Sequence, residues 1–191
     1  VMERTIFGVT LTASQFGSLN ALFIFLFAPL FALLWTALGR RGREPRTPVK
    51  FALGIAQAGL GFGALIVGAA HPDEAGLVSG YWLVLAYLLH TTGELCLSPV
   101  GLSAVTKLSV PSITGVMMGT WFLATAYSNF VAAQLSQLAA LGTVDGTVTD
   151  TGAALANYTA LFGKLFWLGL GMGVLLLLLS PLLKRMMKGI H

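Results

Sequence analysis

The sequence is short of charge. Only 9% of its 191 residues are Asp, Glu, Lys or Arg, whereas 56% are hydrophobic. A soluble domain carries roughly 25% charged residues, so a chain of this composition cannot cover its surface with groups that favour water. The mean hydropathy of +0.84 agrees with this. The composition therefore excludes an ordinary soluble domain and predicts that the lipid bilayer is a partner of this protein.

Cysteine and enzyme motifs are also scarce. Cys96 is the only cysteine, so no intrachain disulfide can form, and we expect a small buried apolar side chain there. The sequence has no GxSxG or HExxH motif, which argues against hydrolytic chemistry. His90 and Glu94 alone are too few ligands for a metal ion. We therefore expect no enzyme, no metal and no cofactor.

Five apolar segments are each long enough to cross a bilayer, which takes ~20 residues. They cover residues 16–38, 51–70, 81–108, 113–141 and 158–183, approximately. Five such helices leave too little polar surface for a soluble helical core. We therefore predict an all-α membrane protein with five transmembrane helices.

The basic residues alternate between successive loops. The loops at 71–80 and 142–157 contain Asp or Glu but neither Lys nor Arg, whereas the other loops and the C-terminal tail are basic. The basic residues are Arg40, Arg41, Arg43, Arg46, Lys50, Lys107, Lys184, Arg185 and Lys188. Positive residues stay on the cytoplasmic side. We therefore expect a multi-pass protein of the cell (inner) membrane, with the N-terminus of this chain outside and its C-terminus in the cytoplasm.

Two further points follow from the ends and the charges. Because the basic clusters flank apolar segments, they indicate topology, and we expect no nucleic acid as a partner. The chain does not begin with Met, and residues 1–8 lack the features of a signal peptide. It also has an odd number of predicted spans, the first of which starts on the outer side, which is unusual for a complete transporter. We expect this chain to be the end of a larger protein.

Small residues are spaced for close helix packing. Helices in lipid associate by close fit, which GxxxG pairs permit. Three segments contain such pairs: Gly59 with Gly63, Gly115 with Gly119, and Gly169 with Gly173. The fourth segment also has a polar outer half around Asn129, which is expected to face a bundle interior or a wet cavity. The pattern predicts a packed bundle.

A carboxylate interrupts the third apolar segment in the stretch HTTGELCLSPVG. Glu94 is about 20 Å from either end of that segment, near the middle of the bilayer. A charged side chain there costs roughly 2.5–3.5 kcal/mol on insertion scales, so it is a functional candidate. His90, Glu94 and Ser98 share one helical face. Pro99 and Gly101 loosen the helix just beyond, as at the sites of many transporters.

Two motifs resemble one known family of transporters. The stretch GELCLSPVGLSAVTKLS at 93–109, followed by MMGTWFLATAYSN at 117–129, resembles the proton-coupled oligopeptide transporters of the major facilitator superfamily. Residues 15–35 and the tail SPLLKRMMKG are similar to the eighth helix and the end of the twelfth. The resemblance implies that the five segments are helices 8 to 12 of a twelve-helix fold. It also implies that the seventh helix and the N-terminal half are missing from this chain and are its partners.

The resemblance also implies roles for single residues. Glu94 matches the family's glutamate that attracts the amino terminus of a peptide, and Ser98 matches the serine one turn later. Asn20 matches an asparagine that hydrogen-bonds the peptide backbone. Trp121 matches a tryptophan that lines a side-chain pocket, helped by Phe122. Where the family commonly has Gln-Ser-Leu-Asn-Pro, residues 17–21 are Gly-Ser-Leu-Asn-Ala, a departure on the eighth helix.

The leading hypothesis is therefore a symporter that imports di- and tripeptides with H⁺ as the coupling ion, by alternating access. In this hypothesis a hinge and inner gate are formed by Pro99, Gly101, Lys107, Gly115 and Gly119. Three alternatives stay open. The protein transports another solute such as a drug or nitrate, it is an intramembrane enzyme that uses His90 and Glu94, or it is a non-transporting membrane subunit or receptor.

Overall fold

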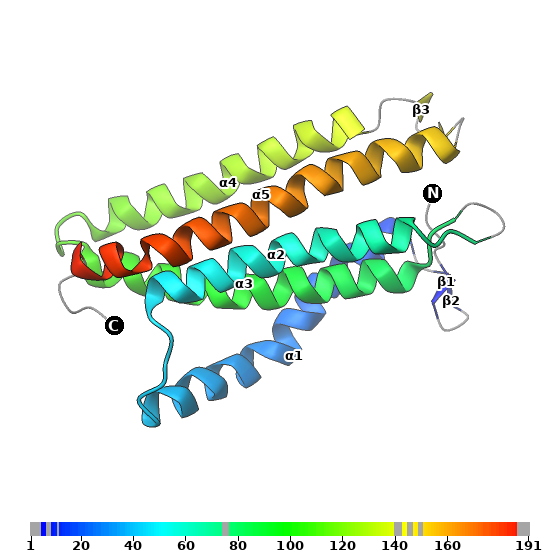
Figure 1. Ribbon diagram of the computed structural model, residues 1–191. Helices are drawn as coiled ribbons and strands as arrows, with labels where there is room; N and C mark the ends of the chain where they lie inside the picture. Colours follow the sequence, from blue (N-terminus) through cyan, green and yellow to red (C-terminus); the bar gives the residue numbers. More distant parts are fainter. Residues whose placement is uncertain are drawn as a thin grey trace.

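The computed structural model describes residues 5–6, 9–10, 12–73, 77–139, 143–144, 147–148 and 151–186. Five helices make up nearly all of this part (Figure 1): α1 Ala13–Arg40, α2 Thr47–Ala69, α3 Gly80–Leu108, α4 Thr114–Ala139 and α5 Thr151–Met186. Two antiparallel pairs of two-residue strands lie outside them: β1 Thr5–Ile6 with β2 Val9–Thr10, and β3 Thr143–Val144 with β4 Thr147–Val148. The five predicted helices are confirmed.

The fifth helix differs most from the expectation. It begins at Thr151, whereas the apolar pattern placed its start near residue 158. The extra turns contain Ala153, Ala154, Leu155 and Ala156, which are strong helix formers whether or not lipid surrounds them. The apolar pattern therefore predicts the part of α5 that suits a bilayer. The helix itself begins earlier, because the preceding residues also favour helix.

Four helices of the described part are long and apolar enough to cross a membrane, judged by length and composition. In the most apolar 18-residue stretch of each helix, the mean hydropathy is 2.4 for α1, 1.8 for α2, 1.3 for α3 and 2.1 for α5. Helix α4 is 26 residues long but more polar, because its second half contains Ser128, Asn129, Gln134, Ser136 and Gln137. These polar residues are exposed, so nothing in the described part of the chain covers them.

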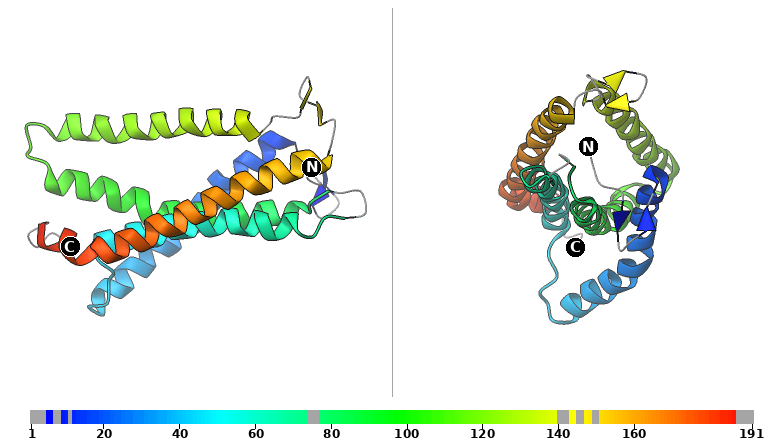
Figure 2. Two further views of the ribbon diagram at one scale, coloured as in Figure 1. Left: turned by 45° about the horizontal axis from the view of Figure 1, so that its top comes forward. Right: turned by 90° about the vertical axis from the view of Figure 1, so that its right-hand side faces the viewer.

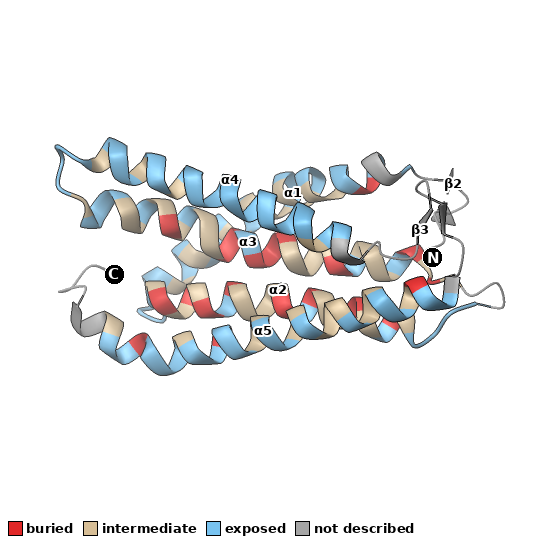
Figure 3. Cartoon of the chain, turned by 90° about the horizontal axis from the view of Figure 1, so that it is seen from above, coloured by how far each residue is buried: buried red, intermediate tan, exposed pale blue. Residues whose placement is uncertain are grey.

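Helices α2, α3 and α5 form the packed part of the bundle, and Figure 3 shows that most buried residues lie on α2 and α3. Gly59 of α2 lies against the backbone of Gly169 of α5. A Cβ added to Gly169 would lie only 2.7 Å from the Gly59 Cα. On the other side of α2, a Cβ at Gly54 would lie 2.7 Å from the carbonyl oxygen of Gly93. Two of the three predicted GxxxG pairs thus join α2 to α5. Close backbone contact of this kind is how helices associate in lipid.

The third GxxxG pair does not pack in the same way. A Cβ at Gly115 or Gly119 would meet no atom within 4 Å in the described structure. Helix α4 touches α3 and α5 at few points, and Figure 2 shows it running beside the bundle as an outer arm. Helix α1 is the second outer arm, because it packs mainly on α3 (Figure 1). The site lies where these arms meet α3.

Helix α3 runs without interruption through Pro99 to Leu108. Proline removes one backbone donor and crowds the preceding turn, yet a helix can continue when neighbours support it. The loosening expected at Pro99 is therefore the loss of one backbone donor and not an end of the helix. The chain leaves the helix only at Ser109, whose hydroxyl donates to the Val105 carbonyl.

Candidate functional site: a polar pair between α1 and α3

Asn20 of α1 and Glu94 of α3 are in direct contact. The Asn20 Nδ2 donates to the Glu94 Oε2 at 3.2 Å and to the Thr91 Oγ1 at 3.1 Å. Thr91 is 0% exposed, whereas Asn20 is half-buried and the Glu94 side chain is exposed. The three side chains form one cluster from two helices that are more than 70 residues apart in sequence. Two residues that the resemblance paired by role are thus neighbours in space.

The exposure of Glu94 has a particular meaning in an apolar helix. Its neighbours in the chain, Gly93 and Leu95, are buried, whereas the Glu94 side chain itself is uncovered. A carboxylate facing hydrocarbon is unfavourable by several kcal/mol, roughly. The uncovered face must therefore meet water, another part of the protein or a ligand. Such a face fits the wall of a cavity.

The two other predicted residues of this face of α3, Ser98 and His90, have different surroundings. Ser98, one turn beyond Glu94, is half-buried. The His90 Nε2 lies 3.0 Å from the Ala58 carbonyl oxygen, and the His90 ring packs against Phe62 with the ring centroids 4.7 Å apart. The His90 ring also lies directly on Gly61 of α2. His90 is therefore committed to helix packing and does not pair with Glu94.

Trp121 lies against α3 two turns beyond Glu94. Its indole occupies the space that a side chain at Gly101 would need, and its ring meets the Phe51 ring edge-on at 6.5 Å. These residues line an apolar cavity of about 300 Å³ between α3 and the start of α4. The adjacent Phe122 is 59% exposed and does not line this cavity. The structure thus separates Trp121 from Phe122.

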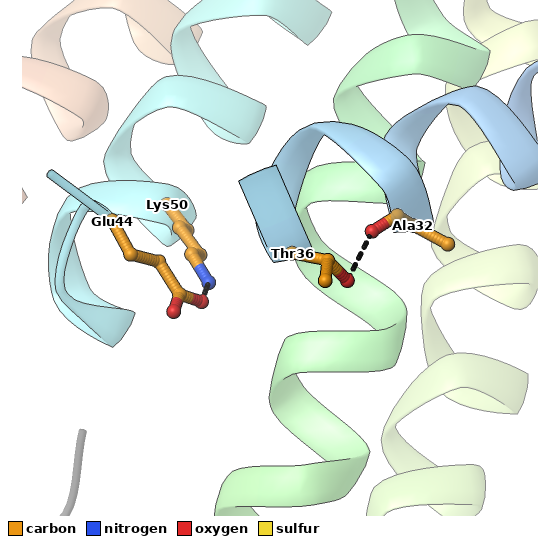
Figure 4. A network of polar contacts seen from close by, with 4 residues as sticks. All are labelled: Ala32, Thr36, Glu44 and Lys50. Carbon is orange, nitrogen blue, oxygen red and sulfur yellow. Dashed lines mark hydrogen bonds and ion pairs between the residues drawn. The ribbon is translucent and has the colours of Figure 1, made fainter. Parts of the chain in front are cut away.

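A second polar cluster lies at the end of the bundle where α1 ends and α2 begins. The buried Lys50 Nζ donates to the Glu44 Oε1 at 2.5 Å and lies 4.7 Å from the centre of the Trp35 ring. Figure 4 shows the two charged side chains pointing at each other beside the last turns of α1. Lys107 is exposed and lines a cavity of about 170 Å³ with Lys50 and Ser103. This cluster ties the loop between α1 and α2 to the bundle.

Sequence reasoning missed two of these residues. Thr91 lies three positions before Glu94 and shares its helical face, which was the available signal. Lys50 was read only as one of a row of basic loop residues, because nothing local in the sequence indicates that its side chain is buried. Both interactions join residues of different helices, so neither motif nor periodicity reports them.

Metal chemistry finds no support in the described residues, which contain no group of three or more His, Cys, Asp and Glu side chains able to hold a metal ion. The polar groups of the Asn20–Thr91–Glu94 cluster are instead an amide, a hydroxyl and a carboxylate. Such groups bind an ammonium group or a peptide backbone by hydrogen bonds. The cluster suits recognition better than reaction.

The long apolar helices and the uncovered carboxylate of Glu94 define a helical, multi-pass class of membrane protein. Comparison with known proteins defines the family. The sequence profile of the POT family (PTR2) matches residues 1–161. The chain is 44% identical over 183 residues to the uncharacterized transporter YclF of Bacillus subtilis (strain 168), covering 96% of this chain and 34% of YclF. It is 36% identical over 188 residues to dipeptide and tripeptide permease A of Edwardsiella piscicida, covering 98% of this chain and 37% of the permease.

The fold agrees with solved structures of the same family. A crystal structure of the peptide transporter POT in complex with sulfate superposes with a TM-score of 0.80 at 39% sequence identity, covering 98% of this chain and 35% of that one. Tetrameric PepTSo2 superposes with a TM-score of 0.71 at 26% identity, covering 95% of this chain and 36% of that one. The chain belongs to the POT family. It spans about a third of the length of the curated relatives it matches.

Proposed function

We propose that this chain is the C-terminal part of a proton-coupled symporter that imports di- and tripeptides by alternating access. In this proposal the five helices correspond to helices 8 to 12 of a twelve-helix transporter. An N-terminal bundle and a seventh helix complete the cavity that the uncovered faces of α1, α3 and α4 border. The basic ends of the helices lie in the cytoplasm of a cell whose inner membrane the protein spans.

The contact between Asn20 and Glu94 carries the proposal. A short peptide has an ammonium group at one end and amide donors and acceptors along its backbone. Glu94 offers a negative charge at the depth where water is scarce, and Asn20 adds an amide within 3.2 Å of it. A charge-assisted hydrogen bond is about twice as strong as a neutral one. We assign Glu94 the role of attracting the peptide amino terminus, with Asn20 and Ser98 beside it.

The gate is proposed at the end where α3 turns into α4. Pro99 and Gly101 weaken the last turns of α3, and Trp121 lies on Gly101. Lys107 lies near the end of the same helix, and Gly115 and Gly119 allow α4 to move because nothing described packs on them. Rocking of one bundle against the other about a central site is the usual transport motion of such folds. The coupling proton is the driving ion in this proposal.

The relatives support peptides as the substrate class, because several are named dipeptide and tripeptide permeases. The geometry disfavours the enzyme alternative, because the His90 ring nitrogen lies against a backbone carbonyl of α2. Two competitors remain: a transporter of another solute, such as a drug or nitrate, and a membrane subunit or receptor that transports nothing. Both are outcomes of the following experiment.

The experiment uses the full-length transporter that contains this chain, reconstituted in liposomes with an inward proton gradient. Uptake of a labelled dipeptide is measured alone and with unlabelled dipeptides, tripeptides, nitrate or a cationic drug as competitors. We expect uptake that depends on the gradient and is blocked by di- and tripeptides only. Competition by nitrate or the drug without competition by peptides would contradict the proposal, as would uptake unaffected by collapsing the gradient.

A further inference from the structure

Thr91 is the largest fully buried side chain of the described residues, and it lies next to the proposed binding site. Its Oγ1 accepts a hydrogen bond from the Asn20 Nδ2 at 3.1 Å. The same nitrogen donates to the Glu94 Oε2 at 3.2 Å. An amide NH₂ group has two hydrogens, so both of them point toward α3. The rotation of the Asn20 amide is thereby fixed from two sides.

The charge of Glu94 decides which way the amide faces. An ionised carboxylate only accepts hydrogen bonds, so Asn20 must present its nitrogen to Glu94 and turn its oxygen away. Among the hydrogen bonds of the described residues, none uses the Asn20 Oδ1 or the Glu94 Oε1. Both oxygens therefore remain available, and the Glu94 side chain lies on an uncovered face.

We propose that Thr91 is a positioning residue for recognition of an ammonium group. It holds the Asn20 amide so that the Asn20 Oδ1 and the Glu94 carboxylate together form a set of hydrogen-bond acceptors. This inference rests on the proposed function and deepens it, because it adds a buried residue that orients the Asn20 amide beside Glu94. An ammonium group has three donors and a positive charge, whereas an acylated amine has one donor and no charge. The site therefore selects peptides with a free amino terminus.

A packing role for Thr91 makes the opposite prediction for two conservative variants. Thr91→Val keeps the shape and removes the hydroxyl, whereas Thr91→Ser keeps the hydroxyl and removes a methyl group from a fully buried position. If Thr91 only fills space, Thr91→Ser is the more harmful change, because it leaves a small cavity. If Thr91 positions Asn20, Thr91→Val is the more harmful change, because it removes the acceptor.

The test measures uptake of a labelled dipeptide by the full-length transporter at matched membrane levels. We expect Thr91→Val to raise KM about three- to tenfold, the factor that one net hydrogen bond sets, with little change in maximal rate. Thr91→Ser is expected to stay within about twofold of the parent, because it rescues the bond. A larger rise in KM for Thr91→Ser, or parental KM for both variants, overturns the inference.

Two controls separate the inference from its alternatives. Thr92→Val removes the neighbouring buried hydroxyl, which accepts from the Gln57 Nε2 of α2 at 2.5 Å, and is expected to leave KM unchanged. In an Asn20→Ala background the KM effect of Thr91→Val is expected to vanish, since there is no amide left to position. An additive effect contradicts the positioning role.

Peptide uptake by the parent protein distinguishes a failure of the proposed function from a failure of the role given to Thr91. If the parent takes up no peptide, the proposed function fails and the inference fails with it. If the parent takes up peptides but Thr91→Ser is the worse variant, only the inference fails. Should Thr91→Val not reach the membrane, Thr91→Cys takes its place, because a thiol is a weak acceptor of similar size and the same order of effects is expected.

Discussion

The seam between α2 and α5 and the contact between α1 and α3 are built on different principles. At the seam, glycine meets glycine, and backbones approach so closely that an added Cβ would lie 2.7 Å from the opposite Cα. Between α1 and α3 the specific contact is instead polar, an amide shared by a hydroxyl and a carboxylate. The seam leaves no room for a side chain, whereas the polar contact leaves the Asn20 Oδ1 and the Glu94 Oε1 without a hydrogen bond to any described residue.

This difference separates what holds the bundle together from what it presents to a substrate. Close glycine packing tolerates no change of shape, because protein interiors are packed as densely as organic crystals. A polar contact on an uncovered face can exchange a neighbour for a ligand at small cost in free energy. Function is therefore expected in the outer arms α1 and α4 and on the face of α3 that they share.

The largest expected effect comes from filling the seam. Gly169→Leu places a side chain on the Gly59 backbone, so α2 and α5 must separate, which typically destabilises by 1–3 kcal/mol or more, roughly. The melting temperature of the detergent-solubilised transporter is expected to fall by about 5 °C or more.

Gly171→Leu is the matched control for the seam. Gly171 lies two residues along the same helix and is exposed, and an added Cβ there would meet nothing within 4 Å in the described structure, so the melting temperature should stay close to that of the parent. Equal losses for both variants would show that glycine content, and not the seam, matters.

An intermediate effect is expected where the two kinds of contact meet. Gly101→Val drives a side chain into the space of the Trp121 indole, which must move into the apolar cavity between α3 and α4. We expect a melting temperature lower by about 3 °C and slower uptake. The stability loss should largely disappear in a Trp121→Ala background, because the two residues are in contact. If Gly101→Val were equally destabilising in the Trp121→Ala background, the Trp121 indole would not lie on Gly101.

The smallest expected effect concerns the ion pair at the end of α1. Glu44→Ala leaves the buried Lys50 ammonium beside the Trp35 ring without its carboxylate partner, and Glu44 itself is 45% exposed, so the loss is screened to about 1 kcal/mol. Adding Lys50→Met removes the stranded charge and should restore stability, which thermal unfolding of the two variants compares. A further loss in the double variant would mean that Lys50 stabilises the bundle without Glu44.

The sequence predicted the seam better than the site. Glycine pairs and apolar lengths are periodic properties of one helix, so five helices and two of the three GxxxG contacts were predictable. Gly115 and Gly119 have the same spacing but no described neighbour, because spacing cannot reveal which helix stands opposite. Glu94 was predicted to be a functional candidate from the cost of placing a charge at that depth of the bilayer, which is also a property of one position, whereas its role came from the resemblance.

Relations between helices were beyond that reasoning. Nothing in the sequence around Asn20 shows that its amide reaches Thr91, and nothing around Lys50 shows that the loop before it folds back to supply Glu44. Trp121 and Phe122 are adjacent in sequence and were assigned to one pocket. Adjacent residues on a helix point about 100° apart, which explains why only one of them packs on α3.

The most direct test of the central claim compares a dipeptide with its N-acetylated form in the full-length transporter and in its Glu94→Ala variant. The account predicts that the parent binds the free dipeptide at least about tenfold more tightly than the acetylated one. The Glu94→Ala variant is expected to insert normally into the membrane, to take up no dipeptide and to bind both peptides equally weakly. Parental uptake, or an unchanged preference for the free amino terminus in a well-inserted Glu94→Ala variant, would contradict it.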